Sequence, residues 1–502
     1  MLLPSAFSQP SIYNLRSMTI FTLVLYVAMV AAVFTLVTKF VLKKVNNLLV
    51  SFLQHFCGVL FVFSGFVKAI DPLGTAYKME QYFAKFESTF EGTWFAFIAP
   101  LFPLLTKYVN GFSVFMIVFE ILLGVMLIIG SSRRFTAWAF FLLVLFFTIL
   151  TGFTYLTGHV PPEVNFFSFG KWGPFVETNM QVTDCGCFGD FLKLKPKVSF
   201  MKDIFLLIPA LIFTFGFRKM HQLFSMPIRS ILNVATVVGI TLYCFNNYIW
   251  DIPAINFRPF KPGVDIVKQK DAEEAAQQGV KITAYRLTEK KTGKVVEVPY
   301  EQFMKELDKY PSEKFDFDQV KSEPVIPITK ISDFDLTGPD GSSVTEDWKS
   351  IKGYHFMVVA YKLYGEEAGT KTETVRDSVF KTLPDSSKVF DSIATRTITH
   401  KQYKWDEHYL AKWKKVVSEM TKAKKAGAMV YAITSPYDPA MIDAFKEKTG
   451  FDFLVLRADD ILLKTIIRSN PGVLLFKDGT IVEDWHIRKL PKFEEIKTTY
   501  MK

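Results

Sequence analysis

The stretch Phe115-Met-Ile-Val-Phe-Glu120-Ile-Leu-Leu-Gly124 lies inside an apolar run over residues 111–130, and runs of this kind decide the class of fold. A helix needs about 20 consecutive apolar residues to cross the hydrocarbon core of a bilayer. The first half of the chain holds five further runs, over residues 19–42, 47–69, 135–157, 203–217 and 230–250. The sequence therefore predicts an all-α bundle of about six helices whose first partner is the lipid bilayer.

The two halves of the 502-residue chain differ in composition. Residues 1–250 are crowded with Phe and aliphatic side chains, and we expect them to form a membrane domain. The remaining residues are rich in Lys, Asp and Glu, and we expect a linker and β-hairpin region over 251–328 and a soluble α/β domain over 329–502. The net charge of +10 is dispersed and forms no basic stripe with interleaved aromatics, so no nucleic-acid partner is expected.

Basic residues in the turns predict the orientation, because cytoplasmic loops of membrane proteins carry an excess of Lys and Arg. The turns after the first, third and fifth runs carry Lys39, Lys43, Lys44, Arg133, Arg134, Arg218, Lys219 and Arg229. With six crossings these turns share one side. We therefore expect a multi-pass protein of the bacterial inner (cytoplasmic) membrane, with its C-terminal domain in the periplasm. Apolar residues at helical spacing over 77–90 predict a further helix on the outer membrane surface.

The stretch Asp184-Cys185-Gly186-Cys187-Phe188-Gly189 lies in the second long outer loop and holds two of the four cysteines of the chain. Gly186 gives the backbone the freedom that a bridge between Cys185 and Cys187 needs. Such a bridge would be strained, and strained disulfides are the labile or catalytic ones. Cys185 and Cys187 are therefore the candidate catalytic residues, flanked by Asp184, which disfavours thiolates.

Two other interpretations of this pair stay open. The cysteines could form a purely structural bridge, or they could supply two ligands of a metal ion. A metal site would need further ligands from scattered groups such as His159 or Asp184. We expect no metal.

Glu120 is an acid near the centre of a predicted membrane helix, where an ionised and unpaired carboxylate costs several kcal/mol. His55, Lys68, Ser64 or Thr148 could reach the same depth and pair with it. A protonated Glu120 that donates one interhelical hydrogen bond is the structural alternative. Glu120 and Lys68 are therefore candidate supporting residues of the site.

The motif Phe63-Ser64-Gly65-Phe66-Val67-Lys68-Ala69-Ile70-Asp71-Pro72, with Glu120, Gly124 and Cys185–Gly189, resembles the DoxX/MauE superfamily of small four-helix membrane proteins over residues of about 45–250. The resemblance implies a four-helix core, with the first helix as an addition, and a likeness to the core of vitamin K epoxide reductase-type enzymes. It also implies quinone-linked oxidation or disulfide formation in exported proteins, so a quinone is the candidate cofactor. The Cys-x-x-Cys pair that the reductase-type enzymes carry within a helix is absent from this sequence.

The second half begins with a predicted helix around 270–278 and a hairpin over 280–288 and 294–298. From Ile331 onward strands and helices alternate. We expect, in order, a strand–turn–strand over 334–344, a strand over 354–361, a helix over 403–426, a strand over 429–433, a helix over 439–449, a strand over 453–456, a helix over 461–468, a hairpin over 472–476 and 481–486, and a closing helix.

This order resembles a thioredoxin-like domain of the membrane-tethered TlpA/peroxiredoxin type over residues of about 330–502. Asn470-Pro471 stands where that family places a cis-proline beside its active site. The catalytic Cys-x-x-Cys that should follow the strand ending near Tyr361 is missing, and residues 258–502 contain no cysteine. The resemblance therefore implies a redox-inactive domain with a partner-binding groove at Asn470 and Pro471.

Two functions follow. In the first, the protein is an envelope thiol–disulfide oxidoreductase in which Cys185 and Cys187 exchange with an extracytoplasmic protein client. In the second, it is a non-enzymatic membrane subunit, or scaffold, of an envelope or export complex. The missing cysteines of the soluble domain favour the second function, and the Cys-Gly-Cys loop favours the first.

Overall fold

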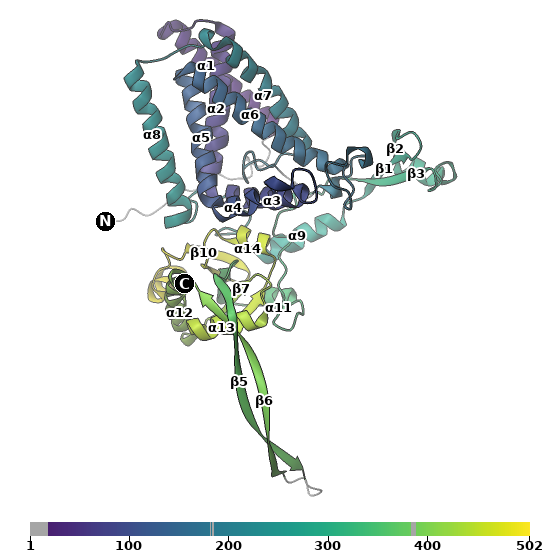
Figure 1. Ribbon diagram of the computed structural model, residues 1–502, viewed down its shortest axis with the longest axis vertical. Coiled ribbons are helices and arrows are strands. Elements are labelled where there is room, and N and C mark those ends of the chain that lie inside the picture. The colour runs from purple at the N-terminus through teal and green to yellow at the C-terminus, as the bar shows by residue number, and fades with distance from the viewer. Residues whose placement is uncertain (1–18, 181, 183–184, 383–387) are drawn as a thin grey trace.

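The computed structural model describes residues 19–180, 182, 185–382 and 388–502. A bundle of long helices forms one half of the molecule, and an α/β head lies across one end of that bundle (Figure 1). A small three-stranded lobe projects beside the bundle, and a long two-stranded ribbon extends from the head on the side away from the bundle.

Within the described residues, six helices are long and apolar enough to cross a membrane, as predicted. They are α1 (Ile20–Leu36), which a π-helical turn continues to Val41, and α2 (Leu48–Ile70), α5 (Val109–Ile129), α6 (Arg133–Leu156), α7 (Pro196–Gly216) and α8 (Met226–Phe245). The fifth of them, α7, begins at Pro196, seven residues before its predicted start at 203. Proline is well suited to the first turn of a helix, because the missing N–H would have no intrahelical acceptor there.

Close packing of α2 against α5 sets the geometry of the bundle interior. A Cβ atom on Gly58 of α2 would lie 2.8 Å from the carbonyl oxygen of Gly124 in α5, and a Cβ atom on Gly124 would lie 2.8 Å from that of Gly58. Glycine lets the two backbones approach this closely. One consequence is that Lys68 and Glu120, further along the same two helices, come into direct contact.

Two further helices, α3 (Pro72–Phe90) and α4 (Leu101–Lys107), lie across the end of the bundle that faces the head (Figure 1). The predicted helix over 77–90 is therefore present and starts earlier, at Pro72. Its Phe86 and Phe90 contact Phe102 of α4, with ring centroids 5.5 and 5.6 Å apart. The predicted basic turns gather at the opposite end, where Arg133 Nη1 donates to the carbonyl oxygen of Arg218 at 3.2 Å.

The head contains a five-stranded sheet in the order β10-β9-β4-β7-β8. Its strands are β4 (Tyr354–Ala360), β7 (Met429–Thr434), β8 (Leu454–Arg457), β9 (Gly472–Lys477) and β10 (Thr480–His486). β4, β7 and β8 run parallel, and β9 pairs antiparallel with both β4 and β10. The helices of the head are α9 (Ile266–Gln278), α11 (Thr345–Lys349), α12 (Glu407–Lys425), α13 (Pro439–Thr449), α14 (Asp460–Ile466) and α15 (Phe493–Tyr500).

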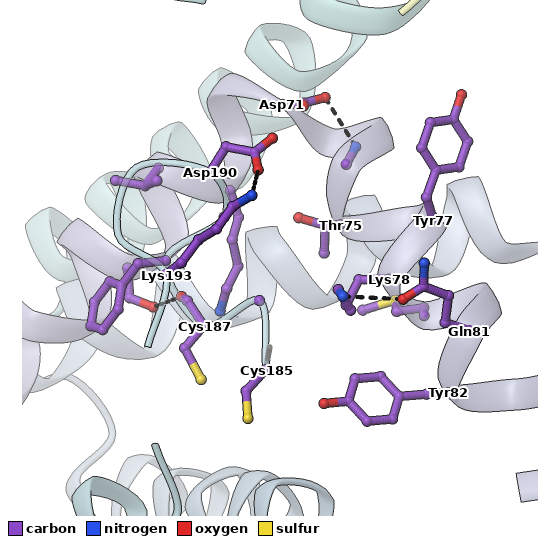
Figure 2. Close-up of a pocket in the computed structure, with 18 of the residues that line it drawn as sticks. Asp71, Thr75, Tyr77, Lys78, Gln81, Tyr82, Cys185, Cys187, Asp190 and Lys193 are labelled. Atoms are coloured by element: carbon purple, nitrogen blue, oxygen red, sulfur yellow. Dashed lines mark hydrogen bonds and ion pairs between the residues drawn. The ribbon is translucent and has the colours of Figure 1, made fainter. Parts of the chain in front are cut away.

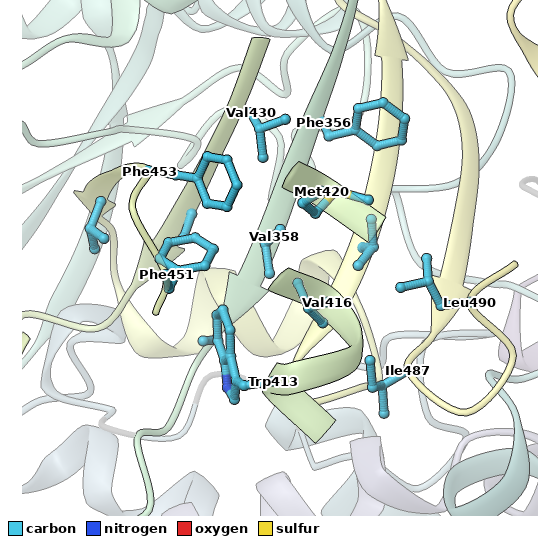
Figure 3. Packing of buried hydrophobic residues seen from close by; sticks show 14 of the residues in the cluster. Phe356, Val358, Trp413, Val416, Met420, Val430, Phe451, Phe453, Ile487 and Leu490 are labelled. Carbon is cyan, nitrogen blue, oxygen red and sulfur yellow. The ribbon is translucent and has the colours of Figure 1, made fainter. Parts of the chain in front are cut away.

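Helices cover both faces of this sheet, which explains why β4 is a continuous apolar run. Phe356 and Val358 point to the face covered by α12, where Trp413, Val416 and Met420 pack on them (Figure 3). The alternate residues of β4 point to the other face, against α14, α11 and the start of α9. The predicted membrane bundle followed by a soluble α/β domain is therefore confirmed.

The lobe is the sheet β2-β1-β3, formed by β1 (Ile282–Glu289), β2 (Val295–Pro299) and β3 (Phe315–Lys321), with α10 (Tyr300–Lys305) beside it. The hairpin of β1 and β2 agrees with the predicted one. β3 was not predicted, because its sequence, Phe-Asp-Phe-Asp-Gln-Val-Lys, mixes charge with aromatic residues within an otherwise polar segment.

Two predictions for the head are wrong in detail. Residues 334–344 form only isolated bridges, from Thr337 to Ser343 and to Arg457, instead of two strands. The helix predicted over 403–426 starts at Glu407, because the Asp406 side chain accepts a hydrogen bond from the backbone N–H of Tyr409 at 2.6 Å and caps it. Residues before Asp406 instead belong to the ribbon of β5 (Gly365–Thr382) and β6 (Lys388–Trp405).

Candidate functional site

Cys185, Gly186 and Cys187 lie in the loop that joins α6 to α7, and three features hold the loop against the bundle. The hydroxyl of Ser64 in α2 donates a hydrogen bond to the carbonyl oxygen of Cys187 at 2.8 Å. The Phe188 side chain is 1% exposed and packs in the bundle core. Gly186 adopts φ +62°, a conformation that favours glycine, and a Cβ atom there would lie 3.1 Å from Cγ of Lys78. Asp184 lies outside the described residues.

A cavity of about 730 Å³ opens beside both cysteines. Its walls come from α2, α3, α5, α6, α7 and the cysteine loop, and on the side of the head from α14 and the segment before the head. The sulfur atoms of Cys185 and Cys187 project from the loop on the same side, away from the ion pair of Asp190 and Lys193 (Figure 2). Cys57 and Cys244 lie inside the bundle, and all four cysteines are thiols in this structure.

Two ion pairs line the same cavity. Nζ of Lys68 lies 2.6 Å from Oε2 of Glu120, and both side chains are buried. Lys202 pairs with Asp203, its neighbour in α7, and Asp203 also accepts a hydrogen bond from the hydroxyl of Thr151 at 3.0 Å. Of the partners considered for Glu120, the structure therefore selects Lys68. Ser64 instead holds the cysteine loop, and Thr148 donates to the carbonyl oxygen of Val144 in its own helix.

Lys202 and Asp203 were not predicted as site residues, because the predicted fifth apolar run begins only at residue 203. The charged sequence Met201-Lys202-Asp203 lowers the apolarity there, while the helix itself extends back to Pro196. A signal was nevertheless present in the sequence. Lys202 and Asp203 are adjacent residues of opposite charge at the start of an apolar run. Ionisable residues within membrane helices are usually functional or paired with one another.

Burial and charge act in opposite directions on the Cys187 thiol. Burial raises the pKa of Cys187, and the nearby Lys202 ammonium is the largest influence that lowers it. Asp203 and Glu120 raise the pKa further, Lys68 lowers it, and the net direction is upward. A Cys187 thiolate therefore depends on the cations that face it.

The head closes one side of the cavity through an ion pair with the membrane domain. Arg468, which follows α14, contacts Asp71, the residue between α2 and α3, with Nη2 at 2.7 Å from Oδ2. Lys464 of α14 also pairs with Glu80 of α3 at 3.1 Å. Burial by itself would raise the pKa of Asp71, but the charge and hydrogen bonds of Arg468 outweigh it, so this pKa is lowered.

The peptide bond between Asn470 and Pro471 is cis. Pro471 is buried, and the side-chain amide of Asn470 donates to the carbonyl oxygen of Lys362 at 2.7 Å. Lys362 follows β4 and Tyr361, and the Tyr361 ring meets Tyr77 of α3 edge to face with centroids 5.9 Å apart. The end of β4 that follows Ala360 thus faces the membrane domain. A partner-binding role for Asn470 and Pro471 stays a prediction.

Metal ligation has no further support within the described part of the chain, where no group of three or more His, Cys, Asp and Glu side chains could hold a metal ion. The Nδ1 atom of His159, one of the ligands considered, instead lies 3.1 Å from the carbonyl oxygen of Gly173.

Residues 46–162 match a family model described as methylamine utilisation protein MauE. The match covers α2 to α6, including Lys68, Asp71 and Glu120, and makes this part of the chain a MauE-like membrane region. It ends before the cysteine loop and does not reach the head. No curated protein matches the chain, and no solved structure matches it.

Proposed function

We propose that this protein is a membrane thiol–disulfide oxidoreductase whose exchanging pair is Cys185 and Cys187, facing the periplasm of a bacterial inner membrane. The observation that carries the proposal is the cavity in which both cysteines meet two buried ion pairs. Buried ion pairs rarely stabilise a fold more than apolar residues of similar volume would. Their position beside two thiols is therefore better explained by the chemistry of those thiols.

The reaction is the oxidation of a client dithiol. A client thiolate attacks one sulfur of the Cys185–Cys187 disulfide, forms a mixed disulfide and releases the other cysteine as a thiolate. The second client thiol then attacks the mixed disulfide and releases the first cysteine. The client loses two electrons and two protons, and Cys185 and Cys187 gain them as two thiols. A strained bridge across one glycine favours this direction.

Reoxidation of the pair needs an acceptor of two electrons, and a quinone is the candidate. The apolar wall of the cavity suits its ring and tail, with Leu60, Phe61, Met116, Phe147 and Leu206 from four helices of the bundle. Lys68, which lines the same space, would supply a hydrogen-bond donor to one of its oxygens. A bound quinone would accept the two electrons and two protons of the dithiol.

The head is proposed to be thioredoxin-like and redox-inactive, with a role in admitting or presenting extracytoplasmic protein clients. The sheet order β10-β9-β4-β7-β8 and the cis bond before Pro471 support the resemblance to TlpA/peroxiredoxin-type domains. The position at which that family carries its cysteines, after β4, is occupied here by Tyr361-Lys362-Leu363-Tyr364. This face of the head lies against α3, beside the cavity of the membrane thiols.

The test is a redox titration of the purified full-length protein in lipid nanodiscs, with thiols counted by alkylation and mass spectrometry. We expect Cys185 and Cys187 to convert together between dithiol and disulfide, while Cys57 and Cys244 do not respond. Cys187→Ser should accumulate a mixed disulfide through Cys185 in cells. A pair that never interconverts between −350 and −100 mV, roughly the range of the thiol–disulfide proteins, would exclude the proposal.

The alternative, a non-enzymatic subunit or scaffold of an envelope complex, is favoured by the docked state of the head. Arg468, Lys464 and Tyr361 all engage α3 or its N-terminus. If the cysteine pair does not titrate and the protein still copurifies with a fixed set of envelope proteins after Cys185→Ser and Cys187→Ser, the alternative is the better description.

A further inference from the structure

Charged side chains of the bundle lie beneath the cysteine loop, next to Cys187. Lys202 of α7 reaches toward the loop, and its Nζ lies 5.9 Å from the centroid of the Phe188 ring, the residue next to Cys187. The Lys202 side chain is 16% exposed, and its partner Asp203 is 2% exposed. Lys202 is therefore held at the inner wall of the cavity, next to the peptide segment that carries Cys187.

Adjacent residues of a helix do not face one another, so an ion pair between Lys202 and Asp203 requires the long lysine side chain to fold back along the helix. Asp203 is in turn fixed by the hydroxyl of Thr151 from α6 at 3.0 Å. The carboxylate thus positions the ammonium group. In this arrangement Lys202 lies close to Cys187. Among the charges around Cys187, that of Lys202 lowers the pKa of the thiol most.

Other charged groups face Cys187 from the elements packed around it. Lys68 of α2 and Glu120 of α5 form one pair, and Lys202 and Asp203 of α7 form the other. Lys78 of α3 lies against Gly186. The two pairs together carry no net charge, so the distance of each charge from the sulfur decides how much it changes the pKa of Cys187. The Lys202 ammonium lowers this pKa more than the Lys68 ammonium does.

From this geometry we infer that Cys187 is the leaving group, released as a thiolate, when a client opens the Cys185–Cys187 disulfide. Lys202 is the positioning residue that stabilises this thiolate, and Asp203 holds Lys202 in place. The inference rests on the proposed function and adds the roles of the two cysteines to it. The client thiolate attacks Cys185, the bond between the two sulfurs breaks, and its electron pair leaves with Cys187 as a thiolate beside Lys202. Exchange is faster when the departing thiolate is better stabilised.

The test measures the thiolate of Cys187 directly. Full-length protein with Cys185→Ser is alkylated with iodoacetamide across a pH series, and the rate at the Cys187 peptide is followed by mass spectrometry. Lys202→Met should move the midpoint of this profile up by about one pH unit, which lowers the thiolate fraction roughly tenfold at a fixed pH below the midpoint. Asp203→Asn should move the midpoint down, because it removes a negative charge and leaves the ammonium.

Lys202→Arg, which keeps the positive charge, should stay near the parent profile. Lys197→Met is the matched control, because Lys197 is an exposed cation of the same helix that does not line the cavity. A purely structural role of the Lys202–Asp203 pair would move the profiles of Lys202→Met and Asp203→Asn in the same direction, and that result would overturn the inference.

The redox titration of Cys185 and Cys187 distinguishes a failure of this inference from a failure of the proposed function. If Cys185 and Cys187 interconvert between dithiol and disulfide but Lys202→Met leaves the midpoint of the Cys187 alkylation profile unchanged, the inference on Lys202 is wrong and the proposed function stands. If the pair never interconverts, the proposed function fails and the assigned roles fail with it.

Discussion

Arg468 of the head and Asp71 of the membrane domain form a bidentate ion pair, although they are 397 residues apart in the sequence. Nε of Arg468 lies 2.9 Å from Oδ1 and 2.8 Å from Oδ2 of Asp71, and Nη2 lies 2.7 Å from Oδ2. The same carboxylate accepts a hydrogen bond from the backbone N–H of Gly74 at 3.0 Å and caps α3. One acid therefore fixes both the start of α3 and the position of the head.

Removal of the guanidinium should loosen the head. In Arg468→Met, Asp71 stays largely buried without its cation, and the loss of one partner of a buried pair costs on the order of 3 kcal/mol. We expect faster hydrogen exchange in α3 and α14, measured by mass spectrometry on the protein in nanodiscs. Arg488→Met, at an exposed arginine of the head, is the control and should leave both helices unchanged. Equal exchange in the two variants would contradict this role of Arg468.

The same pair predicts how docking depends on pH. The pKa of Asp71 is lowered in the folded state, since Arg468 outweighs the effect of burial. The ionised form is then favoured by folding, so this stabilisation is complete above the unfolded-state pKa of about 3.9 and is lost as pH falls through the lower folded-state value. The protection factors of α3 and α14, which compare the measured exchange with the intrinsic amide exchange at the same pH, should therefore be constant from pH 7 to about pH 4 and fall below it. Asp71→Asn should remove the dependence, and a fall of the protection factors already between pH 7 and 5 would argue for a different group.

Sequence patterns predicted the elements better than the contacts between them. The apolar runs predicted α1, α2, α5, α6 and α8 within a few residues, because hydrophobic length is a property of consecutive positions. Gly186 and the cysteines were evident for a similar reason, as a short motif in a cysteine-poor chain.

Contacts between residues far apart in the sequence were not predicted. Asp71 stands in the quoted membrane motif, but nothing in the sequence indicates that Arg468 would reach it. The start of α7 was missed because charged residues near its N-terminus mask an apolar helix, and with it the pairing of Lys202 with Asp203. The ribbon of β5 and β6 was not predicted, because its two strands pair with one another and carry polar side chains on both faces.

Gly186→Ala should disturb the cysteine loop. An alanine at φ +62° costs about 1–2 kcal/mol, and its Cβ would lie 3.1 Å from Cγ of Lys78. We expect the rate of disulfide formation between Cys185 and Cys187 in a glutathione buffer to fall about fivefold, the equivalent of 1 kcal/mol. Gly170→Ala is the control, because Gly170 lies in the same outer loop with no atom within 4 Å of an added Cβ. Equal rates in all three proteins would show that the backbone at Gly186 does not limit ring closure.

The ion pair of Lys68 and Glu120 should show strong coupling between its partners. Glu120→Gln leaves the Lys68 ammonium buried without its carboxylate, at a cost on the order of 3 kcal/mol. In the double variant Lys68→Met/Glu120→Leu both charges are absent, and apolar residues of similar volume replace a buried pair at little or no cost. Thermal unfolding in detergent micelles should therefore place the double variant closer to the parent protein than Glu120→Gln. Glu163→Gln, at an exposed acid of the outer loop, is the matched control for the loss of one carboxylate. The single variants Lys68→Met and Glu120→Leu complete the comparison. If their effects add up to that of the double variant, Lys68 and Glu120 do not act as a pair, and their direct contact does not contribute to stability.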